Sequence, residues 1–203
     1  MKSVGHIFGG EAKVKIMRLF VFNPNQVFSL EEIAIRVKEK PRTVKKEVGI
    51  LMKAGLVCRK GRVRFVVKRK RGKPKVMQVR GFTLDPEYSY IEPLSNFLID
   101  ARPLTEKDIA KRISRAGNMK LIILSGFFLH DPDSRVDLLV VGDRIKKANL
   151  VSTISNIEAK IGKEIRYASF ETPDFNYRLG AYDKLVRDIL DYPHKTVLNK
   201  LGI

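Results

Sequence analysis

The sequence has almost no cysteine and no long apolar run. Its 203 residues include a single cysteine, Cys58, which cannot form an internal disulfide or supply a multi-cysteine metal site. The longest apolar stretch, residues 121–129, is too short to cross a bilayer, and the first fifteen residues lack the apolar core of a signal peptide. We therefore expect a cytoplasmic protein of a reducing compartment, without a membrane partner.

Acidic residues are scarce in the first part of the chain. Residues 1–84 contain 22 lysines and arginines but only five glutamates and no aspartate, a net charge of +17, whereas the whole chain carries +18. Residues 85–203 are close to neutral, with 18 basic and 17 acidic side chains. This asymmetry indicates two units, of which only the first faces a polyanion. A membrane is a poor candidate for that polyanion, because the chain shows no basic amphipathic helix typical of membrane binding.

Apolar residues at helical spacing predict three short helices before residue 55. The second opens with a capping box of Ser29 and Glu32, and the third begins at Pro41 and ends at Gly55. The last two helices are joined by a tight turn, which is a helix-turn-helix arrangement. The residues predicted to face inward from the three helices are Val14, Met17, Phe20, Val21, Ile33, Ala34, Val37, Val44, Val48, Leu51 and Ala54.

A β-hairpin is predicted next, because two runs of β-branched and aromatic residues flank the turn-rich residues 70–74. From Arg59 to Arg80 this segment has no acidic residue, so its folding concentrates like charges that bound phosphates would neutralise. Its basic residues are Arg59, Lys60, Arg62, Arg64, Lys68, Arg69, Lys70, Arg71, Lys73, Lys75 and Arg80.

Residues 28–57, FSLEEIAIRVKEKPRTVKKEVGILMKAGLV, resemble the helix-turn-helix of bacterial and archaeal winged-helix transcription regulators. In that family a "TV…L..L…GLV" tail leads the recognition helix into the wing. The resemblance implies double-stranded DNA as the partner and a nucleoid-associated protein, with the third helix in the major groove and the wing on backbone or minor groove. A homodimer is expected from half-site geometry. The predicted DNA-binding residues are Arg42, Thr43, Lys45, Lys46 and Lys53 of the helix, and Lys68, Arg69, Lys70, Arg71, Lys73 and Lys75 of the wing.

The second half of the chain predicts a small α+β unit. Residues 85–104 contain three prolines and an apolar run at helical spacing, which predicts a connecting helix between a first domain, residues 1–84, and a second, residues 105–203. Thr105 and Asp108 predict a capping box. Buried strands are predicted in MKLIILSG and RVDLLVVG, then an amphipathic helix, a third strand in EIRYASF, helices over residues 173–191, and a tail.

The order of strand, Ser-Gly turn, strand, helix and strand resembles the minimal nucleotidyltransferases of the polymerase-beta type. In that family a glycine turn precedes an Asp-apolar-Asp pair, whose two carboxylates share one strand face and hold Mg²⁺ against a triphosphate. Ser125 and Gly126 occupy the turn in reversed order, and Asp137 matches the second carboxylate. Arg135 stands at the first carboxylate position, and a cation there cannot ligate Mg²⁺.

We therefore predict a degenerate transferase-like domain without catalytic residues, metal site or cofactor. Ser125, Gly126 and Asp137 would form a vestigial nucleotide pocket, in which Asp137 pairs with Arg135 or with another cation. The domain would sense a ligand, dimerise or dock a partner.

The sequence as a whole predicts an α+β protein, with an N-terminal winged helix-turn-helix followed by a small nucleotidyltransferase-like α/β domain with a short mixed sheet. The expected function is that of a DNA-binding transcription regulator. Two alternatives stay open. One is an active Mg²⁺-dependent nucleotidyltransferase that uses Asp137 with Asp133 or Glu171, and the other is an RNA-binding protein, which the hairpin charge allows equally well.

Overall fold

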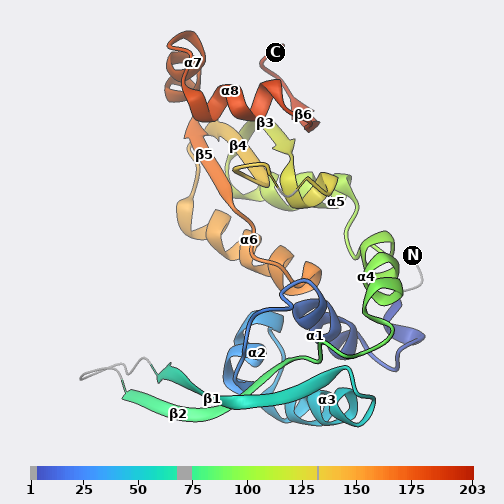
Figure 1. Cartoon of the computed structure of the whole chain (residues 1–203). Helices are drawn as coiled ribbons and strands as arrows, with labels where there is room; N and C mark the ends of the chain where they lie inside the picture. The colour runs from blue at the N-terminus through green and yellow to red at the C-terminus, as the bar shows by residue number, and fades with distance from the viewer. Residues whose placement is uncertain (1–3, 68–74, 132) are drawn as a thin grey trace. The chain divides into compact units, whose positions relative to one another are not determined.

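The computed structural model describes residues 4–67, 75–131 and 133–203. The fold is α+β, with a two-stranded antiparallel sheet and a four-stranded mixed sheet (Figure 1). The chain divides into unit 1, Met1–Pro103 with Glu158–Lys163, and unit 2, Leu104–Ile157 with Glu164–Ile203. Across the described ranges, no helix has both the length and the apolar character needed to span a bilayer.

Unit 1 is built on three helices that share one apolar core. The helices are α1 (Glu11–Val21), α2 (Leu30–Val37) and α3 (Pro41–Lys53), with a short 3₁₀ turn, η1 (Val4–His6), before them. The rings of Phe20 and Phe28 meet edge to face at 5.8 Å in this core. Every residue predicted to face inward is buried except Ala54, which lies after the last turn of α3 and is exposed.

The capping box predicted for α2 is present. The Ser29 hydroxyl accepts a hydrogen bond from the Glu32 amide at 3.1 Å, and the Glu32 carboxylate accepts one from the Ser29 amide at 2.7 Å. These bonds satisfy two amides that a helix start leaves without intrahelical partners. At its other end α2 stops at Val37, where Lys38 adopts a left-handed conformation with φ of +54°, and α3 begins at Pro41.

The predicted hairpin is present as β1 (Val57–Val67) and β2 (Lys75–Leu84), paired antiparallel. Its register shifts at a bulge between Arg59 and Arg62. The base of the hairpin is tied to the helices because Phe28 and Phe82 exchange backbone hydrogen bonds of 2.8 Å in both directions. The hairpin therefore extends from a base that is anchored in the core of unit 1.

The predicted connecting segment contains α4 (Ile91–Asp100), whose Leu98 is buried in the core of unit 1. Residues 158–163, at the end of α6 (Lys147–Ile161) and just after it, also belong to unit 1. There the side-chain amide of Asn23 donates to the Gly162 carbonyl at 2.8 Å and to the Leu19 carbonyl at 2.7 Å. Unit 1 thus includes a segment distant in sequence, which Asn23 binds through a hydrogen bond.

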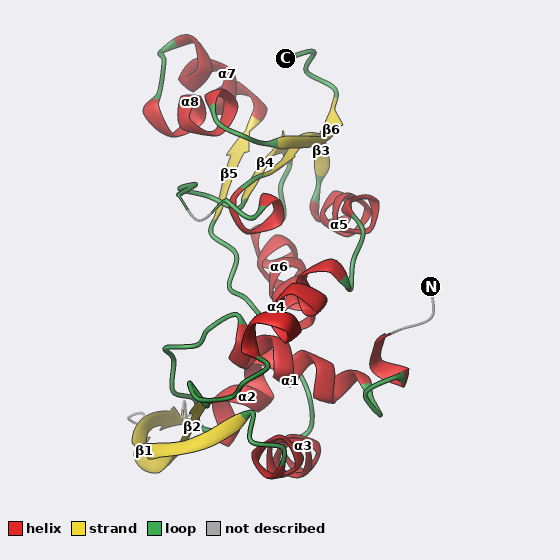
Figure 2. Ribbon diagram, turned by 45° about the vertical axis from the view of Figure 1, so that its right-hand side comes forward, coloured by secondary structure: helices red, strands yellow, loops and turns green. Residues whose placement is uncertain are grey.

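Unit 2 is organised by a sheet in the order β5-β4-β3-β6 (Figure 2). In chain order its elements are α5 (Glu106–Ile113), η2 (Ser114–Ala116), β3 (Asn118–Leu124), η3 (Gly126–Leu129), β4 (Leu138–Asp143), most of α6, β5 (Tyr167–Glu171), α7 (Thr172–Gly180), α8 (Lys184–Asp191) and β6 (Lys195–Asn199). Strands β3 and β4 are antiparallel and β4 and β5 are parallel. One face of β3 and β4 packs against Phe175 of α7 and Val186 and Ile189 of α8.

The predicted tail after residue 191 contains a strand that the sequence reading did not include. Strand β6 pairs antiparallel with β3, so that Leu121 lies opposite Asn199 and Ile122 opposite Leu198. This pairing places β3 between two hydrogen-bonded neighbours.

Replacing Ser29 with alanine is expected to lower the free energy of unfolding by ~1 kcal/mol, within a range of about 0.5 to 2, because the acceptor for the Glu32 amide is lost. Urea denaturation of the full chain measures this change. Ser152→Ala, at an exposed position of α6, is the control and should stay within about 0.5 kcal/mol of the wild type. Equal effects of the two substitutions would show that the cap contributes nothing.

The second capping box makes a pH-dependent prediction. Hydrogen bonds from the Thr105 side chain and backbone, at 2.7 and 3.1 Å, lower the pKa of Asp108 below its ordinary value. The stability that this carboxylate contributes is therefore present above the ordinary pKa and lost as the pH falls through the lowered one. In a carbon-13 NMR titration, Thr105→Ala should raise the pKa of Asp108 and Thr196→Ala should not. An unchanged value in the Thr105 variant would contradict the assignment.

Candidate nucleic-acid interface

One face of α3 carries a row of cations. Residues 42, 45, 46 and 53 are cations that share one side of the helix with Gly49, because these five positions are spaced by one, three or four residues. Arg42, Lys45, Lys46 and Lys53 are exposed, whereas Val44, Val48 and Leu51 are buried on the opposite side. The predicted contact Thr43 is only partly exposed, because it sits between these two sides.

The hairpin brings further cations together in pairs. Arg62 lies directly opposite Arg80 in the ladder, and both are exposed. Arg64, two residues beyond Arg62, projects from the same face of the strand. Like charges directly opposite each other destabilise a hairpin unless an anion lies between or above them.

The predicted wing residues fall largely at the end of the hairpin. Lys68, Arg69, Lys70, Arg71 and Lys73 lie outside the residues that the structure describes, and Lys75 is the first residue of β2. The hairpin cations whose exposure is described are Arg59, Lys60, Arg62, Arg64 and Arg80. The sequence identified all five as part of a basic run. That Arg62 lies opposite Arg80 could not be predicted, because it depends on the bulge in the strand register.

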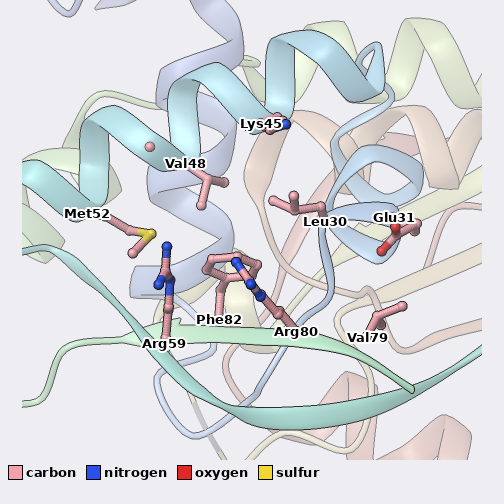
Figure 3. Close-up of a pocket in the computed structure, with 10 residues that line it drawn as sticks. Leu30, Glu31, Lys45, Val48, Met52, Arg59, Val79, Arg80 and Phe82 are labelled. Carbon is pink, nitrogen blue, oxygen red and sulfur yellow. The ribbon is translucent and has the colours of Figure 1, made fainter. Parts of the chain in front are cut away.

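A groove of about 400 Å³ lies between α3, the start of α2 and the hairpin (Figure 3). Arg59, Arg80 and Phe82 rise from the strands towards α3, while Val48 and Met52 point down from α3. The lining residues are Leu30, Glu31, Lys45, Val48, Gly49, Met52, Arg59, Val79, Arg80 and Phe82. The groove therefore combines an apolar floor with a cationic rim, and Glu31 is the one carboxylate among these residues.

Three of the five glutamates of residues 1–84 are engaged in contacts outside this groove. Glu39 pairs with Lys15 at 2.6 Å, Glu47 pairs with Lys13 at 3.6 Å, and Glu32 caps α2. Within the described part of the chain, no carboxylate lies at ion-pair distance from Lys45, Arg59 or Arg80. The positive potential of this surface is thus not neutralised by the protein itself.

In unit 2 the predicted nucleotide pocket is closed around Asp137, which is 2% exposed. One of its carboxylate oxygens accepts from the Phe127 amide at 2.8 Å and from the Arg166 guanidinium at 3.0 Å. The other accepts from the Arg166 amide at 2.9 Å and from its side-chain Nε at 3.1 Å. The hydrogen bonds that the Arg166 side chain donates to Asp137 raise the pKa of Arg166. Four N–H donors thus occupy the carboxylate.

The Ser-Gly turn packs directly against the Asp137 carboxylate. Gly126 has a φ of +51°, and a β-carbon at this position would collide with the Asp137 carboxylate. The Ser125 hydroxyl donates to the Val136 carbonyl at 2.7 Å. The turn therefore closes over Asp137 and uses glycine for space as well as for backbone conformation.

Asp137 was predicted to pair with Arg135 or with another cation, and the cation in the structure is Arg166. Arg135 instead pairs with Asp188 at 2.9 Å. Of the alternative carboxylates, Asp133 is exposed, and Glu171 accepts hydrogen bonds from the Arg144 and Ile145 amides. No group of three histidine, cysteine or acidic residues in the described ranges could hold a metal ion.

The exposed cations of unit 1 are groups that can hydrogen-bond to anions. Guanidinium and ammonium groups donate charge-assisted hydrogen bonds to phosphate oxygens, and a shallow apolar floor can contact the carbons of a sugar. Comparison of the chain with protein-family models, with curated proteins and with solved structures found no match.

The two arginines near Asp137 give a matched pair of substitutions. Arg166→Ala leaves a buried carboxylate without its cation and should lower the free energy of unfolding by about 3 kcal/mol, the low end for a buried ion pair because the Arg166 side chain is 52% exposed. Arg135→Ala breaks a surface pair and should cost about 1 kcal/mol or less. Urea denaturation compares them. A cost for Arg166→Ala no larger than that for Arg135→Ala would refute a structural role for the Asp137 contact.

Proposed function

We propose that unit 1 is a winged helix that binds duplex DNA. In this proposal α2 and α3 form the helix-turn-helix, and the β1–β2 hairpin is the wing. The order of the elements, the tight turn between α2 and α3, and the hairpin anchored beside them all support this architecture. An α-helix fits the major groove of B-form DNA, and α3 presents its cations on the side away from the core.

The observation that carries the proposal is the unneutralised charge shared by α3 and the hairpin. The exposed row on α3 and the opposed pair Arg62 and Arg80 face no carboxylate partners in the described chain. Such an arrangement is unfavourable in the free protein and becomes favourable when phosphates neutralise it. Duplex DNA is the polyanion whose groove matches an exposed helix flanked by a hairpin.

Within this site the two elements have different tasks. Arg42 and Lys46 lie on the exposed face of α3, where side chains of a recognition helix reach base edges. Arg62 and Arg64 on the hairpin are placed to contact phosphates or the minor groove, which positions the protein without reading sequence.

Unit 2 is proposed to be a nucleotidyltransferase-like module without catalysis. Its Asp137 is saturated by four N–H donors, and Arg135 stands where a first metal-binding carboxylate would be required. This carboxylate links the Ser-Gly turn to the residue before β5, because it accepts hydrogen bonds from the Phe127 and Arg166 amides. We propose that unit 2 senses a ligand, dimerises or docks a partner, and that the whole chain is a transcription regulator.

Selection of bound duplexes from a random pool at physiological salt tests the DNA-binding proposal. The wild type should recover a sequence motif, and Arg42→Ala/Lys46→Ala should lose it, because base contacts from α3 are removed. Lys107→Ala/Lys184→Ala removes the same charge from exposed positions of unit 2 and should recover the motif unchanged. A palindromic motif would indicate a dimer.

Salt dependence measures the electrostatic part of the interaction. The logarithm of the association constant should fall linearly with the logarithm of the salt concentration, with a slope of roughly 0.9 per phosphate neutralised. An affinity that hardly changes between low and moderate salt would defeat the proposal. Tighter binding to structured RNA than to duplex DNA at one salt concentration would show that RNA is the preferred ligand of this interface.

A further inference from the structure

A glycine occupies the centre of the cationic face of α3. Lys45 lies one turn before Gly49 and Lys53 one turn after it, so the row of side chains is interrupted at its middle. Glycine in a helix interior is unfavourable, because it loses more backbone freedom on folding than any other residue. A glycine at this place therefore lowers the stability of α3, and some other feature should explain why it is there.

Among the residues that the structure describes, no contact supplies such a reason. A β-carbon added at Gly49 would meet no atom within 4 Å, and its backbone is not in the left-handed region that favours glycine. By contrast, Gly126 is required by both its conformation and the nearby carboxylate. The space above Gly49 is therefore open to a molecule from outside.

That space is part of the groove between α3 and the hairpin. Gly49 is one of the residues that line it. The apolar side chains of Val48 and Met52 line it too, together with Arg59 and Arg80 from the strands (Figure 3). A sugar–phosphate strand alternates apolar sugar carbons with anionic phosphates. The apolar floor and cationic rim complement these two components.

We propose that one sugar–phosphate strand of the bound duplex enters this groove and approaches α3 most closely at Gly49. Lys45, Arg59 and Arg80 donate to its phosphates. The inference rests on the proposed function and adds the point of closest backbone approach. Glu31, at the start of α2, repels phosphate, so the charged groups of the strand lie on the side of the three cations.

A series of substitutions at Gly49 tests the inference. Gly49→Ala and Gly49→Gln fill the open space with increasing bulk and without changing charge, and both residues favour helix. Both variants should keep or raise the midpoint of thermal unfolding. Their affinity for the selected duplex should fall with side-chain size, and Gly49→Gln should bind about tenfold more weakly or worse, which is ~1.4 kcal/mol.

Gly180→Gln is the matched control. Gly180 is also helical, and an added β-carbon there would also meet nothing within 4 Å, but it lies in α7 of unit 2. This variant should bind the duplex as tightly as the wild type. Equal affinities of Gly49→Gln and Gly180→Gln would overturn the inference.

The failure of the inference and that of the proposed function are distinguishable. If the wild type shows no salt-dependent duplex binding, the proposed function fails before the variants are compared. If the wild type binds and Gly49→Gln binds equally well, DNA binding stands and the groove is not a backbone site. If Gly49→Gln unfolds at a lower temperature than the wild type, the claim that the space is free of protein contacts is wrong.

Discussion

The scarcity of carboxylates in residues 1–84 is the constraint on which unit 1 depends. Its five glutamates cannot pair with 22 cations, and the structure places Glu39 and Glu47 beside lysines of α1 and Glu32 at the cap of α2. The cations of α3 and the hairpin are left facing outwards. Burial of the shared apolar core must therefore outweigh their mutual repulsion, and any polyanion that binds the folded form stabilises it further.

Unit 2 uses its buried charge in the opposite way. A single carboxylate, Asp137, gathers donors from the Ser-Gly turn and from the start of β5, so that three segments meet at one side chain. A metal ligand must leave its lone pairs free, and this carboxylate does not. A buried carboxylate that is fully hydrogen-bonded in this way therefore has a structural role and not that of a metal ligand.

Local patterns were sufficient to predict much of the fold. Both capping boxes, the buried faces of α1 to α3, the hairpin and strands β3 to β5 follow from spacing and turn residues, and the structure confirms them. Strand β6 was missed because Val197 and Leu198 are its only apolar residues, which is too short a pattern to predict a strand. In the structure these two residues are partly buried. Pairings across the chain, such as Arg62 with Arg80 and Asp137 with Arg166, depend on a bulge and on parallel strand register that no local pattern specifies.

The position of β3 has a consequence for the order of folding. Its two neighbours are β4, which follows almost at once, and β6, which begins only at Lys195. Unit 1 likewise includes Glu158–Lys163, a segment that is synthesised long after its helices and hairpin. On the ribosome, the hairpin and helices of unit 1 are therefore made well before either unit can close. The slow step of folding should be the late, non-local docking of these segments, during which β3 has one edge without its native partner.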